Sequence, residues 1–161
     1  MAQKTAQSGG GGPRIANRKA RHEFHILEVL ECGLELLGTE VKSLRAGQAK
    51  IDDAFGRVRD GELFLVGATI SPYPNAAEGM QHEPTRDRKL LVHARQIREL
   101  QVHATQKGQT IIPLAIYFKR GRAKCEIGLA TGKRQYDKRQ AIKKRDQQRE
   151  IARELGQRRR R

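Results

Sequence analysis

An Asp-Gly pair between two short strand-like runs constrains the fold of this chain more than any other local feature. Residues 57–59 and 62–66 contain strand-forming side chains such as Val58 and Phe64, and only Asp60-Gly61 separates the two runs. Both positions of a two-residue type I′ turn need a positive φ, which Asp and Gly tolerate. The pattern therefore predicts an antiparallel β-hairpin.

Four further segments have the composition of strands, with apolar, β-branched and aromatic side chains between turn residues. Pro113 interrupts one of them and predicts an edge position or a bulge, because proline donates no ladder hydrogen bond. Arg120-Gly121-Arg122 predicts the turn between the last two. The predicted strands cover residues 23–32, 34–37, 110–118 and 123–130.

Two segments have helical patterns. Gly38 to Gly47 is predicted to form a short helix that Thr39 caps and that Gly47 ends in the left-handed conformation. Lys42 and Arg45 are expected to project from it as a small basic face. The second helix is expected from about His93 to Gly108, because apolar residues recur there at three- and four-residue spacing.

Short turns join the strand pairs, so the sequence favours an antiparallel sheet over a parallel one. We expect a mainly β protein: an OB-like closed antiparallel β-barrel of about six strands, with two or three helices and flexible basic termini. A proline-containing loop over residues 71–88 is expected to separate the hairpin from the later helix.

Charge divides the chain into three parts. The formal net charge is +15, but residues 23–132 carry fifteen basic and fourteen acidic side chains, a net of only +1. Residues 133–161 carry thirteen basic and four acidic side chains, a net of +9. We expect a flexible N-terminal arm over 1–16, an RNA-binding barrel over 17–131, and a basic tail over 132–161. The tail has too few apolar residues to fold alone, so we expect it to be disordered when free and helical on a partner.

The basic ends favour nucleic acid as the partner. Asn17 to His22 forms a dense basic patch directly before the first strand, and Arg86, Arg88 and Lys89 form a second cluster. The chain has only seven aromatic residues, which argues against serial stacking of a single strand. Folded RNA, recognised by shape and backbone, is the expected ligand.

Patterns for other functions are missing from the sequence. The five histidines and two cysteines have no paired zinc spacing, and there is no phosphate loop, dinucleotide fingerprint or nucleophile elbow. We therefore expect no metal, no cofactor and no catalytic residue. No segment approaches the roughly 20 apolar residues of a membrane helix. With no secretory signal pattern near Met1, we expect a cytoplasmic protein with two reduced thiols and no membrane partner.

Several blocks in a fixed order resemble one known family, the SsrA-binding proteins or small protein B, which are the partners of bacterial transfer-messenger RNA. The resemblance extends from about Asn17 to Ile142. The matching blocks are Asn17 to Glu23, Cys32-Gly33, Gly38 to Gly47, Pro84 to Arg86, Arg88 to Leu91, Lys124 to Gly128 and Gly132 to Arg139.

The resemblance implies an OB-like, monomeric protein without catalytic activity. It would bind the tRNA-like domain of transfer-messenger RNA and deliver it to the vacant A site of stalled ribosomes for trans-translation. The alternatives are a basic ribosomal or ribosome-assembly protein, which would share the charge but not the ordered blocks, and an enzyme acting on RNA, which would need a catalytic constellation.

The resemblance also ties individual positions to RNA binding. Glu31 and Leu91 match family positions of that kind, His93 lies beside them, and Phe24 stands where tyrosine is frequent. Together with the basic clusters, the expected RNA-binding residues are Asn17, Arg18, Lys19, Arg21, His22, Phe24, Glu31, Lys42, Arg45, Arg86, Arg88, Lys89, Leu91, His93 and Lys124.

The tail matches the family segment that enters the decoding region of the small ribosomal subunit and follows the vacant messenger channel. Tyr136 would supply a stacking face there. The expected ribosome-binding residues are Lys133, Arg134, Gln135, Tyr136, Asp137, Lys138, Arg139 and Ile142.

Overall fold

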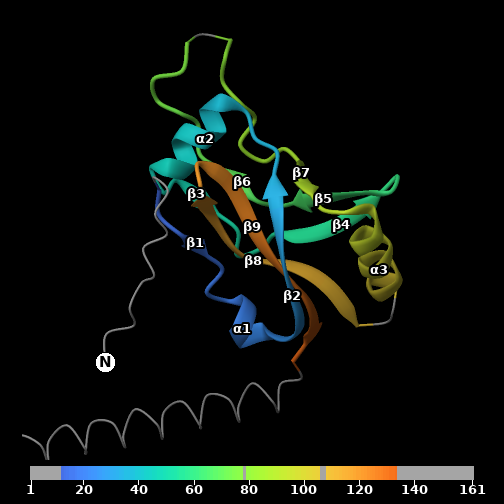
Figure 1. The fold of residues 1–161 in the computed structure, drawn as a ribbon. Helices are drawn as coiled ribbons and strands as arrows, with labels where there is room; N and C mark the ends of the chain where they lie inside the picture. The colour runs from blue at the N-terminus through green and yellow to red at the C-terminus, as the bar shows by residue number, and fades with distance from the viewer. Residues whose placement is uncertain (1–11, 78, 106–107, 134–161) are drawn as a thin grey trace, which may run out of the picture.

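The computed structural model of this chain describes residues 12–77, 79–105 and 108–133. The described part is mainly β, with three helices (Figure 1). In chain order the elements are β1 (Ile15–Ala16), α1 (Ala20–Glu23), β2 (Phe24–Leu34), α2 (Gly38–Arg45), β3 (Ala49–Lys50), β4 (Phe55–Arg59), β5 (Glu62–Val66), β6 (Thr69–Ile70), β7 (Arg88–Leu91), α3 (Ala94–Thr105), β8 (Gln109–Lys119) and β9 (Arg122–Gly132).

Seven strands form the main sheet in the order β1-β8-β4-β5-β7-β2-β9, and β8 also pairs with β9. All of these pairings are antiparallel. Followed strand by strand, the pairing thus starts at β8, passes through β4, β5, β7, β2 and β9, and returns to β8. Strands β4 and β2 are three positions apart in this order of pairing. Strands β3 and β6 form a separate two-stranded sheet.

Both predicted hairpins are confirmed. Asp60 and Gly61 have φ values of 52° and 72°, and they join β4 to β5. Arg120 and Gly121, at 51° and 74°, join the long strands β8 and β9 in the same way. The register between β8 and β9 shifts between Pro113 and Ala115, which confirms the bulge expected at Pro113.

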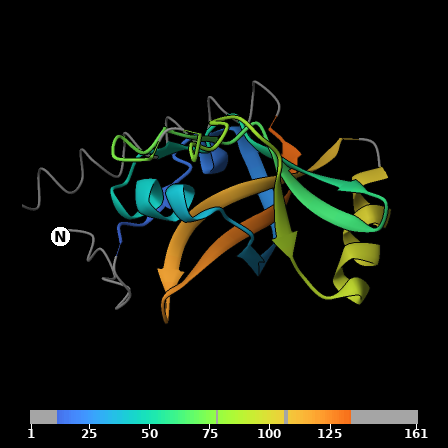
Figure 2. The ribbon, with the colours of Figure 1, turned by 90° about the horizontal axis from the view of Figure 1, so that it is seen from above.

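The core lies inside this cycle of strands. It contains inward side chains such as Leu63, Leu65 and Leu90, and Leu44 of α2 is also completely buried there. Ile97 and Leu100 of α3 pack in the same core, as the apolar spacing predicted. Figure 2 shows α3 beside one end of the curved sheet, while α2 lies at the opposite end.

Two local predictions were wrong. Residues 34–37 do not form a second strand, because β2 continues to Leu34 and residues 35–37 have no strand pairing. Thr39 does not cap α2 either. The Glu40 side chain accepts the Leu37 backbone N–H at 2.7 Å, whereas the Thr39 hydroxyl lies 2.9 Å from Nδ1 of His82. Glu40 therefore holds the start of α2 from within the helix.

Both cysteines are buried, free thiols that face each other across β2 and β9. The Cys32 thiol donates to the Cys125 carbonyl at 3.0 Å. None of the helices in the described ranges is long and apolar enough to cross a membrane.

Candidate nucleic-acid interface

Glu31 lies at the centre of an outward-facing polar cluster on β2, β8 and β9. Its carboxylate accepts a hydrogen bond from the Tyr117 hydroxyl at 2.5 Å. Lys119 Nζ donates to both carboxylate oxygens, at 3.0 and 3.2 Å, and Lys124 Nζ lies 4.0 Å from Oε1. One carboxylate thus organises a phenol and two ammonium groups.

The ionisation of this cluster follows from its contacts. The hydrogen bond from Tyr117, followed by that from Lys119, keeps the pKa of Glu31 below its ordinary value. Burial and the adjacent Glu31 carboxylate raise the pKa of Tyr117 to about 12. Glu31 is therefore an anion at neutral pH, and it would repel a phosphate. In this cluster it accepts hydrogen bonds from Lys119 and lies beside Lys124.

Leu91 gives this surface an apolar centre. This residue is 51 % exposed. Gly33 is paired with both Leu91 and Lys124, so strand register places Leu91 and Lys124 on either side of a glycine. A Cβ on Gly33 would lie only 3.1 Å from that of Leu91. These residues line an open groove of about 390 Å³ between β2, β7 and β9.

The structure therefore brings together three of the residues predicted from the sequence: Glu31, Leu91 and Lys124. His93 is exposed and follows Leu91 by two positions, directly before α3. Lys89 lies on the outward face of β7, where it pairs with Glu62. We call Glu31, Leu91, Lys119 and Lys124, together with the buried Tyr117 whose hydroxyl contacts Glu31, the Glu31 surface.

Sequence reasoning missed Tyr117 and Lys119. Both end a strand whose other residues are almost all buried, and β8 was recognised only by its apolar composition. Their two-residue spacing places them on one face of that strand, and this was the available signal. Nothing local indicated that this face meets Glu31, because the contact spans 86 positions of the chain.

The prediction for Arg88 was wrong. It was expected to contact RNA, but its side chain is completely buried. Its guanidinium donates to Glu40 at 2.9 Å and to three backbone carbonyls, those of Ala68, Pro84 and Arg86. In this arrangement it cannot reach a phosphate. It fixes the loop before β7 instead.

Arg86 shares the same carboxylate and is only partly accessible. Its guanidinium donates to the two oxygens of Glu40 at 2.5 and 2.8 Å. Burial alone would raise the pKa of Glu40, but the hydrogen bonds from Arg86 and from the Leu37 N–H, with the Arg88 charge, hold it below its ordinary value. Two members of the second basic cluster, Arg86 and Arg88, thus share one buried carboxylate, while Lys89 pairs with Glu62.

Asn17 was also expected to bind RNA, and the structure argues against this. Its side chain is 92 % buried, since only 8 % of the residue is exposed. The amide donates to the carbonyls of Ile51 and Pro113, and its oxygen accepts the N–H groups of Lys19 and Ala20 at the start of α1. Asn17 therefore holds the basic patch in place and does not itself face a ligand.

The rest of that patch is accessible. Arg18, Lys19 and Arg21 are exposed, while His22 is half-buried. Phe24 is half-buried and packs on a small apolar cluster formed by Ala20, Ile112, Leu114 and Ala130. The patch therefore offers three cationic side chains on one short segment.

The predicted basic face of α2 is present. Lys42 and Arg45 are both exposed, and each lies over an aromatic ring. Lys42 Nζ is 4.9 Å from the centre of the Tyr73 ring, and the Arg45 guanidinium is 5.4 Å from that of Phe118. Such contacts orient a cation without neutralising it.

Of the predicted ribosome-binding residues, only Lys133 lies in the described ranges. Its backbone N–H donates to Glu23 and its ammonium group to the Arg21 carbonyl, both at 2.8 Å. The last residues of β9 are thus tied to α1. Arg134, Gln135, Tyr136, Asp137, Lys138, Arg139 and Ile142 lie outside the described residues.

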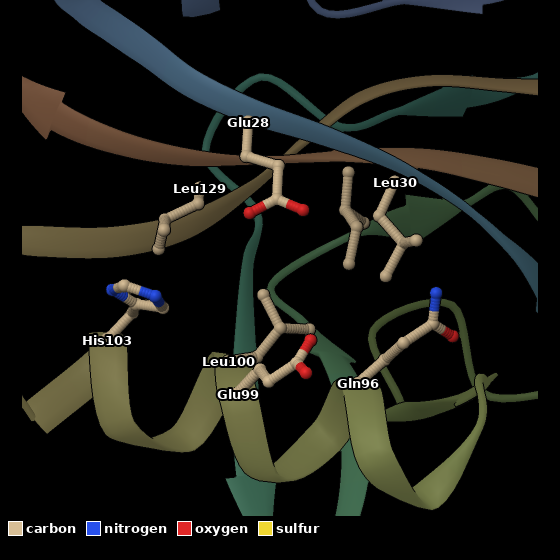
Figure 3. Close-up of a pocket in the computed structure, with 8 residues that line it drawn as sticks. Glu28, Leu30, Gln96, Glu99, Leu100, His103 and Leu129 are labelled. Atoms are coloured by element: carbon tan, nitrogen blue, oxygen red, sulfur yellow. The ribbon is translucent and has the colours of Figure 1, made fainter.

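A different cavity lies between α3 and strands β2 and β9. Figure 3 shows the Glu28 carboxylate directed into it from β2, opposite Glu99 and His103 of α3. Leu30, Leu100 and Leu129 form its apolar wall. Two carboxylates make this cavity a poor site for phosphate, so it is not part of the RNA interface.

The chain has close relatives in sequence and structure. The family model described as SmpB protein matches residues 14–157. An SsrA-binding protein of Thermosynechococcus vestitus is 50 % identical over 142 residues, covering 88 % of this chain and 93 % of the relative. One from Oleidesulfovibrio alaskensis is 49 % identical over 152 residues, covering 94 % and 97 %.

A solved structure is also similar. It is described as "tmRNA-SmpB: a journey to the center of the bacterial ribosome". The matching chain has 46 % sequence identity and a TM-score of 0.66, and the match covers 81 % of this chain and 95 % of that one.

Proposed function

The chain belongs to the SmpB family, and on that premise we propose that it binds transfer-messenger RNA and acts with it in the rescue of stalled ribosomes. The matches to the two SsrA-binding proteins cover 93 % and 97 % of those relatives, so the proposal applies to the whole chain. Delivery of the RNA to a vacant A site for trans-translation is the activity that we propose.

The single observation that carries the RNA interface is the Glu31 surface. Side chains of β2, β7 and the β8–β9 hairpin meet there, and the Glu31 carboxylate lies 3.0 Å from one ammonium group and 4.0 Å from another, beside an exposed leucine. Positioned cations suit phosphate oxygens, while an apolar side chain suits a ribose or a base. This combination favours folded RNA over a small anion.

We propose that the six-strand cycle is a closed barrel of the OB type. The support is that the pairings return to β8 and that α3 lies between β7 and β8 in the chain. We further propose that residues 17–131 act as the RNA-binding body, with residues 1–16 and 132–161 as basic arms.

For the tail we propose a role on the ribosome. Residues 133–139 would bind the decoding region of the small subunit, with Tyr136 stacking on a ribosomal base, and Ile142 would follow in the messenger channel. The support is the charge of the segment and the family membership. The protein itself would act as a cytoplasmic monomer and catalyse no step.

The proposal is tested by sequencing RNA that copurifies with the chain. Tagged protein is recovered from bacterial cells that lack their own copy, in parallel with a variant carrying Leu91→Ala and Lys124→Gln. We expect one tRNA-like transcript, transfer-messenger RNA, to be enriched with the parent and depleted with the variant. Recovery of bulk ribosomal RNA alone would contradict the proposal and favour a ribosomal or ribosome-assembly protein.

A further inference from the structure

We propose a second RNA contact, separate from the Glu31 surface: the groove between β4 and α3 holds one unpaired nucleotide of ribosomal RNA. This inference rests on the proposed function for the identity of the partner. It rests on the structure for the site and for its chemistry.

The groove exists because β4 and β8 separate. Their pairing consists of one position, Gly56 with Ile111, where a Cβ on Gly56 would lie 2.5 Å from an Ile111 side-chain atom. Beyond that close approach the two strands diverge, and α3 lies along the opening (Figure 1). The resulting groove has a volume of about 320 Å³, within the range of small-ligand sites.

One wall of the groove is a stacked pair from β4. The Arg57 guanidinium lies 5.3 Å from the centre of the Phe55 ring. The Arg57 side chain is exposed, so its guanidinium remains accessible to a ligand. A guanidinium in this arrangement can stack on a nucleobase and at the same time donate to a phosphate.

The other wall is polar and comes from α3 and the start of β8. Gln101 and Thr105 of the helix and Thr110 of β8 line it, and they offer amide and hydroxyl groups for the edge of a base. Arg98 lies on the same helical face, three residues before Gln101 and seven before Thr105. It is exposed.

The charge of the groove favours an anionic ligand. Among the described residues, no carboxylate lines it, and neither Arg57 nor Arg98 forms an ion pair with an acid. By contrast, Arg59 on the same strand is paired with Asp87 at 3.3 Å, and Lys89 is paired with Glu62. The cavity on the other side of α3 carries Glu28 and Glu99. Only the β4 side of this helix therefore combines free cations with an aromatic face.

Position favours ribosomal RNA over transfer-messenger RNA. The groove contains the first residues of β8, Gln109 to Ile111, whereas Tyr117 and Lys119 of the Glu31 surface lie near the end of that strand. A folded RNA seated on the Glu31 surface would therefore leave the groove free to contact the ribosome.

The binding experiment uses the full chain, loaded with transfer-messenger RNA, on purified ribosomes with a vacant A site. Arg57→Gln and Arg98→Gln, singly and together, remove the two unpaired cations. Arg95→Gln is the matched control, since it removes one charge from the same helix, where Arg95 pairs with Glu99. Arg57→Lys keeps the charge but loses the planar stacking surface.

We expect the double variant to bind ribosomes at least about fivefold more weakly, with Arg57→Lys between it and the parent and Arg95→Gln unchanged. Binding of transfer-messenger RNA alone should stay within about twofold of the parent. Equal losses for Arg95→Gln and Arg57→Gln would overturn the proposal, because charge alone would then explain them. If the parent binds no transfer-messenger RNA, the proposed function fails before the groove is tested.

A crosslinking measurement locates the partner. A photoreactive benzoylphenylalanine in place of Gln101 should crosslink to an unpaired ribosomal nucleotide in the assembled complex, and Arg57→Gln should reduce the yield. Crosslinks only to transfer-messenger RNA, only to ribosomal protein, or to no molecule would each overturn the assignment.

Discussion

The hydroxyl of Tyr117 on β8 donates a 2.5 Å hydrogen bond to Oε2 of Glu31 on β2, across the intervening strand β9. This contact joins the two residues that fix the geometry of the proposed RNA interface. It also makes the stability of the folded chain depend on pH, because the Tyr117 phenol can lose its proton.

We predict a pH-dependent loss of stability that depends on Tyr117. Its pKa is raised to about 12 in the folded chain, from an ordinary value of 10. The folded state therefore keeps the proton longer than the unfolded state. The contribution of the Tyr117 hydrogen bond to the free energy of unfolding is therefore complete below pH 10. It is lost as the pH rises towards 12, by at most about 1.4 kcal/mol per pH unit.

The measurement is the free energy of unfolding by urea at several pH values, for the parent and for Tyr117→Phe. The difference between the two chains should shrink between pH 10 and pH 12. Parallel curves over that interval would show that the phenol is not held by Glu31.

We predict that Glu40→Gln is strongly destabilising. The substitution removes the carboxylate that forms an ion pair with the buried Arg88, and breaking a buried pair costs about 3–5 kcal/mol. The matched control is Glu62→Gln, which removes a partly exposed partner of Lys89 and should cost about 1 kcal/mol or less.

We also predict that the folded chain loses stability in acid as the Glu40 carboxylate is protonated. Because the pKa of Glu40 is lowered in the folded chain, its contribution is present above the ordinary value of 4.5 and is lost as the pH falls through the lower folded pKa. Urea unfolding between pH 3 and pH 7 measures it. A Glu40→Gln chain with the same stability and the same acid dependence as the parent would contradict this account.

Local patterns predicted the elements that are determined locally. The Asp60-Gly61 hairpin, α3 and the bulge at Pro113 follow from turn chemistry, apolar spacing and the missing N–H of proline. Each of these signals lies within about a dozen residues of the chain. The body of the fold was accessible to sequence reasoning for that reason.

The failures concern side chains whose partners are far away in sequence. Arg88 looked like a free cation because its partner, Glu40, lies 48 positions earlier in the chain. Asn17 looked like part of a basic patch, but it bonds to backbone groups 34 and 96 positions away. Composition identifies charges, and only the tertiary structure shows which of them are already neutralised.

Family resemblance supplied what local patterns could not. It selected Glu31 and Leu91, and the structure then placed both on one face with Lys124. It did not select Tyr117 or Lys119, which the coordinates identified.

We predict that removal of the tail separates recognition from ribosome function. The cut should follow Lys133, because Thr131 and Gly132 pair with β2 and Lys133 bonds to Glu23 and Arg21. The truncated chain should discriminate transfer-messenger RNA from an unrelated tRNA as well as the parent does. It should also show a weaker salt dependence of binding, because basic residues are lost. Competition binding at several salt concentrations measures both, and loss of discrimination would contradict the division of roles.

We predict that Tyr136→Ala spares the binding of free transfer-messenger RNA but lowers peptide transfer on stalled ribosomes. Stacking of an aromatic ring on a base contributes about 1–3 kcal/mol, enough to affect one site. Tyr136→His should be tolerated, since its ring can still stack. A reconstituted transfer assay, with and without messenger in the downstream channel, checks this. Equal rates for Tyr136→Ala and the parent would leave the tail with only its charge.

The most direct test of the account is the equilibrium affinity of the chain for purified transfer-messenger RNA when Leu91 is shortened. Leu91→Ala removes the exposed apolar centre of the Glu31 surface, while Val102→Ala is a matched control on α3, where the valine is 61 % exposed. We expect Leu91→Ala to weaken binding roughly fivefold or more, from the loss of apolar surface buried against the RNA, and Val102→Ala to leave it unchanged. Full affinity in Leu91→Ala, with the fold intact, would contradict the claim that this surface recognises the RNA.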